Sequence, residues 1–209
     1  MLLAYSVGPS TATTATNVAN WTNWTASQLS SKDDQRATTN QTAATGTLSG
    51  FDFSAIPAGY IIDGIVVHIQ ASESHTAANG YLITYLSWDN GTSYTEGKLT
   101  PPSGELPTSD TDYNVGGASD TWGHSWTVSE VTSTFKVKTW GYCASTSRLT
   151  QVDYVAVTVY YHDGVKPGPI TNLSGLTGTY GGEINLTWTS PGDDGYTVNI
   201  ENGKFRIKA

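Results

Sequence analysis

Residues able to do acid–base or metal chemistry are few in this sequence, and their spacing does not favour catalysis. The four histidines are scattered, without the His-x-x-x-His or His-Glu spacing of a metal site; they are His68, His75, His124 and His162. His68 falls on the polar side of a predicted strand, so we expect it to be exposed or hydrogen-bonded. Segment 117–121, GASDT, begins like a nucleophile elbow, but Thr121 replaces the final glycine and no helix is predicted after it. These residues predict no nucleophilic or metal centre.

Carboxylates offer two further kinds of chemistry. Glu96 and Glu105 could flank a glycosidic bond, but nothing in the sequence places them in one cleft, and we expect solvated loop charges. Three Asp-rich turns could supply oxygen ligands to Ca²⁺: Asp89-Asn90, Asp110 with Asp112, and Asp193-Asp194. None matches the twelve-residue EF-hand loop, and isolated Asp turns usually cap backbone amides. We predict no catalytic, cofactor-binding or metal site and no cofactor, with a calcium site as the open alternative.

Tryptophan is unusually frequent for a chain of 209 residues; the seven are Trp21, Trp24, Trp88, Trp122, Trp126, Trp140 and Trp188. Exposed Trp and Tyr side chains can stack on sugar rings, so a lectin-like role is conceivable. Most of these positions fall on predicted strands, however, which favours packing in the core or between subunits. Trp21 and Trp24 lie in a polar segment of low complexity, where each must be buried or contact a ligand.

Charge and cysteine content exclude several classes of protein. The formal net charge is −8 and the isoelectric point is near 4.7, so the surface repels polyphosphate and nucleic acid is not an expected partner. The single cysteine, Cys143, excludes an intramolecular disulfide and is expected to be a small buried side chain. Residues 1–9 are too short for a signal peptide, and no apolar run approaches the length that spans a bilayer.

The elements that would position these residues are predicted to be β-strands throughout. Phe51–Ala71 is the clearest segment: Phe51–Phe53 looks strand-like, residues 56–59 (IPAG) form a turn, and a long strand follows. In that strand Ile65, Val67, Ile69 and Ala71 alternate with Val66, His68 and Gln70. Gly59 marks the turn, and Gly64 marks a bulge or a close backbone approach. We take Phe51–Ala71 as the central strand of a β-sandwich.

The remaining segments are predicted less sharply. Residues 10–47 and 101–117 read as long loops, Tyr81–Trp88 as a buried strand, and Asp89–Thr92 as a hairpin turn with Tyr94 on the return strand. Further strands cover Phe135–Trp140 and Arg148–Tyr161, giving about eight strands over some 160 residues and a jelly-roll-like β-sandwich. Leu2–Val7 is a short apolar segment stopped by Gly8-Pro9. It is either an edge strand of its own domain or a strand donated to a neighbouring subunit.

One linker is evident, at residues 164–169, where Gly and Pro cluster and the composition changes. We predict a first domain over 1–163, a jelly-roll-like sandwich, and a second over 170–209. In the second, residues 169–173 (PITNL), 184–188 (INLTW), 191–195 (PGDDG) and 204–207 (KFRI) carry a pattern that resembles the start of a fibronectin type III domain.

The fibronectin resemblance covers residues 167–209, about a fifth of the chain, and implies a core role for Trp188. A complete immunoglobulin-like sandwich needs about 100 residues and seven strands. Three strands at most fit in the 43 residues from 167, so we expect their apolar face and open edges to need a neighbour.

The first domain is similar to bacterial and phage surface modules. The motifs that carry this similarity are 56–59 with 62–69, Trp122–Trp126 and Val152–Tyr161.

These features together predict an extracellular or cell-surface structural protein without enzymatic activity. We expect a subunit of a filament, fibre or adhesive array that joins copies of itself by β-strand or domain docking. The alternatives are a carbohydrate-binding or adhesin module of a longer secreted protein, which would add surface glycans as partners, and a phage tail-fibre component. An enzyme is the least favoured alternative.

Overall fold

The computed structural model describes residues 5–76, 78–166 and 168–192 of the chain. These residues form twelve strands and one short π-helix, η1 (Glu130–Thr134). The chain divides into two compact units, one spanning Ser6–Tyr161 and the other containing His162 onwards with Met1–Tyr5. We call the first the sandwich unit, and the described residues 162–192 of the second the tail unit. The predicted boundaries at 163 and 170 remain a prediction.

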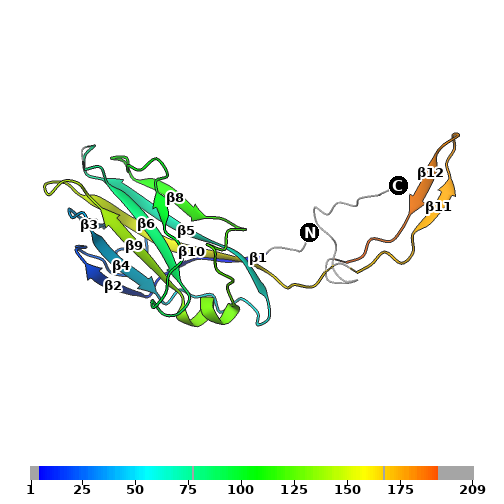
Figure 1. Ribbon diagram of the computed structural model, residues 1–209, viewed down its shortest axis with the longest axis horizontal. Helices are drawn as coiled ribbons and strands as arrows, with labels where there is room; N and C mark the ends of the chain where they lie inside the picture. The colour runs from blue at the N-terminus through cyan, green and yellow to red at the C-terminus, as the bar shows by residue number, and fades with distance from the viewer. Residues whose placement is uncertain (1–4, 77, 167, 193–209) are drawn as a thin grey trace. The chain divides into compact units, whose positions relative to one another are not determined.

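The sandwich unit is built from two five-stranded sheets (Figure 1). Sheet I has the order β1 (Tyr5–Thr11), β10 (Thr150–His162), β5 (Ile61–Glu73) and β8 (Thr111–Gly116), and β3 (Ala37–Thr39) also pairs with β10. Sheet II has the order β2 (Thr14–Ala19), β4 (Ala44–Ser49), β9 (Lys136–Tyr142), β6 (Tyr81–Ser87) and β7 (Lys98–Thr100). The fold is all-β and sandwich-like, as predicted.

The long strand β5 has the alternation that the sequence predicts. Ile65, Val67, Ile69 and Ala71 are at most 1% exposed, while His68 and Gln70 on the other side are partly exposed. Gly59 has a φ of +87° in the preceding turn. A Cβ on Gly64 would lie 2.3 Å from the carbonyl oxygen of Gly117, so this glycine does permit a close backbone approach.

Phe51–Phe53 is not a strand, contrary to the prediction. Both phenyl rings turn inwards and pack edge-on against Phe135, with centroids 5.7 and 5.9 Å from it. The apolar spacing that resembles a strand therefore belongs to a core-lining segment before the turn.

Two predicted loops contain strands, which corrects the sequence interpretation. Residues 10–47 hold β2, β3 and the start of β4, and residues 101–117 hold β8. The strands were missed because Thr, Ala, Gly and Asn fill many of their positions, and β2, β4 and β8 each contain a single branched apolar residue. In β4 the buried positions are Ala44, Gly46 and Leu48.

Trp21 and Trp24 explain why small residues line that part of sheet II. Both indoles are buried, at 4% and 3% exposure, and their ring centroids lie 4.8 Å apart. A Cβ on Gly46 would lie 2.2 Å from Trp24, and one on Gly141 would lie 2.5 Å from Trp21. The two glycines therefore leave the volume that the indoles fill.

β1 runs through Gly8-Pro9 to Thr11, so the prediction that Gly8-Pro9 stops the strand was wrong. Proline is tolerated there because β1 is the end strand of sheet I. Tyr5–Val7 pairs within its own sheet, which agrees with the edge-strand alternative, and residues 2–4 lie outside the described residues.

In the tail unit, β11 (Ser174–Thr177) and β12 (Ile184–Thr187) form an antiparallel hairpin. Every residue of both strands is exposed, including Leu176 and Ile184 at 67% and 72%. The Asn172 amide joins the two ends of the hairpin through hydrogen bonds with the Thr189 hydroxyl and backbone N–H. Within the described ranges, no helix is long and apolar enough to cross a membrane.

Candidate functional site

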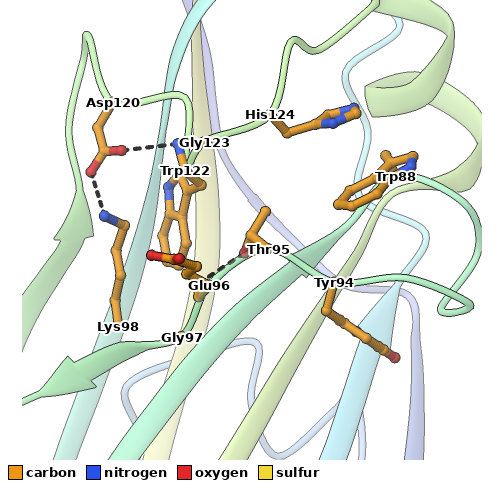
Figure 2. A pocket seen from close by; sticks show the side chains of 10 residues that line it. All are labelled: Trp88, Tyr94, Thr95, Glu96, Gly97, Lys98, Asp120, Trp122, Gly123 and His124. Atoms are coloured by element: carbon orange, nitrogen blue, oxygen red, sulfur yellow. Dashed lines mark hydrogen bonds and ion pairs between the residues drawn. The ribbon is translucent and has the colours of Figure 1, made fainter.

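An open cleft of about 500 Å³ lies where the chain leaves β6 and where it leaves β8 (Figure 2). We call it the Trp88 cleft. Its lining comes from three short segments, with aromatic, charged and glycine residues side by side: Trp88, Tyr94, Thr95, Glu96, Gly97, Lys98, Asp120, Trp122, Gly123 and His124. This volume falls within the range of small-ligand sites.

The segment after β6 is folded back by the turn at Asp89. Asn90 and Gly91 both have positive φ, 61° and 95°, as the two central residues of a tight hairpin turn require. The Asp89 carboxylate accepts hydrogen bonds from the backbone N–H groups of Ser93 and Thr92, at 2.7 and 3.0 Å. This turn brings Tyr94 and Glu96 back alongside Trp88, although Tyr94 precedes the return strand β7 and does not lie on it as predicted.

Trp122 lies at the base of the opposite wall, in a strained backbone conformation. Its φ is 57°, and every other described residue with positive φ is Asn, Asp or Gly. The Asp120 carboxylate accepts a hydrogen bond from the Trp122 backbone N–H at 2.9 Å, and the indole N–H donates to the Ile65 carbonyl at 2.9 Å. The loop is thereby joined to β5, and Trp122 is only 4% exposed.

The third segment holds the indole of Trp88 in place. The His124 ring stacks on it with a centroid separation of 4.1 Å and an interplanar angle of 11°. Trp126 packs edge-on against both rings, and His124 Nε2 lies 3.3 Å from a Glu130 carboxylate oxygen. Burial raises the pKa of Glu130, but hydrogen bonds from Thr127 and His124 outweigh it, and the net shift is downward. The Trp88 indole is therefore packed against two neighbouring rings, those of His124 and Trp126.

Two of the charged side chains in the cleft pair with each other, and a third has no partner among the described residues. Lys98 Nζ lies 2.9 Å from the Asp120 carboxylate and 4.9 Å from the centroid of the Trp122 ring. Partial burial raises the pKa of Asp120, but the bonds from Lys98 and from the Trp122 N–H lower it by more. Glu96, by contrast, is exposed, and its carboxylate has no hydrogen bond or ion pair with the described residues. The lining combines packed aromatic rings with an unpaired carboxylate, which suits binding.

The two carboxylates considered for glycosidic chemistry lie in different clefts. Glu96 lines the Trp88 cleft, whereas Glu105 lines a second cleft with Glu73 and Tyr113. Residues 117–121 form a turn in which Asp120, and not Ser119, makes the structural contacts. His68 is satisfied by the side chains of Asn114 and Thr158, as expected.

The Asp-rich turns serve structural roles in the described part of the chain. Asp89 caps backbone amides, Asp110 binds Arg36, and Asp112 pairs with Lys32 at 2.8 Å. No group of three or more His, Cys, Asp or Glu side chains within the described ranges is placed to hold a metal ion. Asp193 and Asp194 lie outside the described residues.

Among the tryptophans, Trp21, Trp24, Trp122 and Trp126 are buried, and Trp88, Trp140 and Trp188 are partly exposed. Most of them are therefore core residues, and Trp88 is the one that borders the cleft in partial exposure. Sequence reasoning missed this site because its three segments are brought together only by the fold. The one local signal was the run of Gly, Asp and Trp in residues 116–126.

No protein family matches the chain, and no curated protein matches it.

Proposed function

We propose that this protein is a non-enzymatic structural subunit of an extracellular or cell-surface filament, fibre or adhesive array. Its copies join by β-strand or domain docking. In this proposal the sandwich unit is a jelly-roll-like module, and the tail unit is the first part of a fibronectin type III-like domain. The observation that carries the proposal is the exposed apolar hairpin of β11 and β12.

The hairpin presents more apolar surface than an isolated element of its size can tolerate. Leu173, Leu176 and Ile184 are 61%, 67% and 72% exposed, and the hairpin loop adds Tyr180 at 72%. A two-stranded hairpin is marginal by itself, because it needs a third strand or a packed layer to bury its apolar face. Contiguous apolar surface beside open strand edges usually marks an interface.

A neighbouring copy is the partner that this surface fits. The sandwich unit has an end strand, β2, in which every side chain is at least partly exposed and Val18 is 60% exposed. An extended apolar strand can add to such an edge through backbone hydrogen bonds. A donor hairpin and an acceptor edge on one chain would make a head-to-tail contact, and such contacts generate fibres or rings.

Sedimentation velocity of the full chain at micromolar concentration tests this proposal. We expect species larger than a monomer, and we expect the double variant Leu176→Ser, Ile184→Ser to dissociate them. Leu99→Ser is the matched control, because Leu99 is an exposed leucine (40%) on the short strand β7 of the sandwich unit. A wild-type chain that stays monomeric at these concentrations would overturn the proposal, as would association that the double variant leaves intact.

The alternative of a carbohydrate-binding or adhesin module is favoured by one observation, the partly aromatic Trp88 cleft. A phage tail-fibre component would use the same sandwich and hairpin in a trimer. Electron micrographs of the native assembly distinguish such a trimer from a helical filament by its symmetry.

A further inference from the structure

The Trp88 cleft contains a carboxylate that the fold itself does not use. The other polar side chains that could compete for it are engaged: Lys98 Nζ contacts Asp120, and His124 Nε2 contacts Glu130. Glu96 is exposed, precedes Gly97, and makes no side-chain hydrogen bond with the described residues. Gly123 also lines the cleft, and a Cβ there would meet nothing within 4 Å, so this part of the lining is open (Figure 2).

Two aromatic rings of the same cleft, those of Trp88 and Tyr94, are packed against neighbouring side chains. His124 stacks on Trp88 at 4.1 Å, and Lys138 Nζ lies 3.7 Å from the centroid of the Tyr94 ring. Both Trp88 and Tyr94 are half-buried, so part of each ring is free to contact a ligand. Because both are already fixed, binding would cost little side-chain entropy.

The lining selects among ligand classes. A phosphate or another anion would be repelled by the carboxylates of Glu96 and Asp120. The Lys98 ammonium cannot compensate, because it already forms an ion pair with Asp120. A cation over the Trp122 ring would have to displace Lys98. A purely apolar ligand would leave the Glu96 carboxylate desolvated without a partner, which is costly. A neutral polyhydroxy ring avoids all three costs, since its hydroxyl groups can donate to the carboxylate while its C–H face lies on an aromatic ring.

We propose that the Trp88 cleft binds a neutral pyranose sugar unit, with Glu96 accepting hydrogen bonds from adjacent ring hydroxyls and Trp88 contacting an apolar face of the sugar. This site lies in the sandwich unit, so it is independent of the hairpin through which copies are proposed to dock. The strained φ of Trp122 is consistent with a loop held in shape for binding, because such strain collects at functional sites.

Calorimetric titration of the full chain with four neutral oligosaccharides tests the site: cellotriose, maltotriose, lactose and the trimer of N-acetylglucosamine. We expect saturable binding of at least one of them. Glu96→Gln should weaken that binding about fivefold to tenfold, because glutamine keeps an acceptor oxygen but a hydrogen bond to a charged group is stronger than one to a neutral group. Trp88→Ala should weaken it further, and thermal unfolding of each variant would verify that the fold is kept.

Two matched controls separate the cleft from other exposed carboxylates and rings. Glu105→Gln removes a carboxylate of the second cleft, and Trp140→Ala removes a partly exposed indole on β9; neither should change the affinity. Absence of saturation by all four sugars up to about 10 mM, beyond even weak millimolar affinities, would overturn the proposal. Binding that survives Glu96→Gln unchanged, or that Trp140→Ala abolishes, would do the same. The sedimentation result bears only on the hairpin.

Discussion

At the scale of single residues, the fold buries two carboxylates whose burial the sequence does not predict. Glu73 and Asp153 are each 1% exposed, and burial raises the pKa of both. Asp110 shows the opposite behaviour: a hydrogen bond from Arg36 lowers its pKa below the ordinary value. Composition cannot separate these cases, because the burial of a carboxylate depends on which strands and loops come to cover it.

Replacing Glu73 tests the cost of a buried charge. Its carboxylate accepts a hydrogen bond from the Gly80 backbone N–H at 2.8 Å, and glutamine keeps an acceptor there while removing the charge. Because the folded-state pKa is raised, the native state binds more protons than the unfolded state, and stability falls as pH rises through that pKa. We expect Glu73→Gln to unfold at a higher temperature than the wild type at pH 8.

The difference should shrink towards zero below pH 4.5, the ordinary glutamate value, where both forms are neutral. Thermal unfolding followed by circular dichroism across this range measures it. Glu96→Gln controls for the removal of a charge without burial, because Glu96 is exposed and is not among the groups that shift the pKa of Glu73. A wild-type protein at least as stable as Glu73→Gln at pH 8 would contradict the argument.

At the scale of elements, the strands that the sequence predicts well are those with alternating branched side chains. β5 and β10 are of this kind, and in β9 Val137 and Thr139 face inwards as predicted. β2, β4 and β8 were missed because threonine, glycine and asparagine signal loops as readily as strands. Their identity depends on partners far along the chain, since Trp24 fills the space over Gly46 from 22 residues away.

Adding a methyl group at Gly46 or Gly141 tests this packing of tryptophan on glycine. The new Cβ would lie 2.2 Å from Trp24 or 2.5 Å from Trp21, and neither indole has free space to retreat because both are buried. We expect each Gly→Ala variant to lose about 1–3 kcal/mol of unfolding free energy, as overpacked cores do. Urea denaturation would measure the loss.

Gly117→Ala is the matched control, since its nearest neighbour would be Asp120 Cβ at 3.6 Å, an ordinary contact. In a Trp24→Leu background, Gly46→Ala should cost less than in the wild type, which identifies the indole as the obstacle. Equal costs in the two backgrounds would show that the glycine is required for some other reason.

At the scale of the whole molecule, the sequence predicted the class of fold but not the order of the strands. Strand order depends on pairings between distant segments, such as β4 with β9. Their paired positions are 87 residues apart at Ser49–Lys136 and 97 residues apart at Ala44–Gly141. The Trp88 cleft was unpredictable for the same reason. The sequence singled out several of its residues, namely Glu96, Trp88, Trp122 and His124, but it did not join them in one site. It considered Glu96 together with Glu105, which lies in another cleft.

Limited proteolysis of the full chain tests the two-unit organisation and its link to assembly. Val165 and Lys166 are exposed and belong to no strand, so we expect a broad-specificity protease such as subtilisin to cut first between His162 and Ile170. The product would be the sandwich unit, recognised by its mass, while the marginal hairpin is degraded. Trypsin is unsuitable, because Lys166 precedes a proline.

The same digestion depends on concentration if the hairpin docks on neighbouring copies. At concentrations where sedimentation finds a monomer, the hairpin should be lost rapidly; where it finds assemblies, burial of Leu176 and Ile184 should slow that loss. The double variant Leu176→Ser, Ile184→Ser should be digested at the same rate at both concentrations, which excludes substrate competition as the cause of protection. First cuts inside Ser6–Tyr161 would contradict the two-unit organisation, and a hairpin digested equally fast in monomer and assembly would place the contact between copies elsewhere.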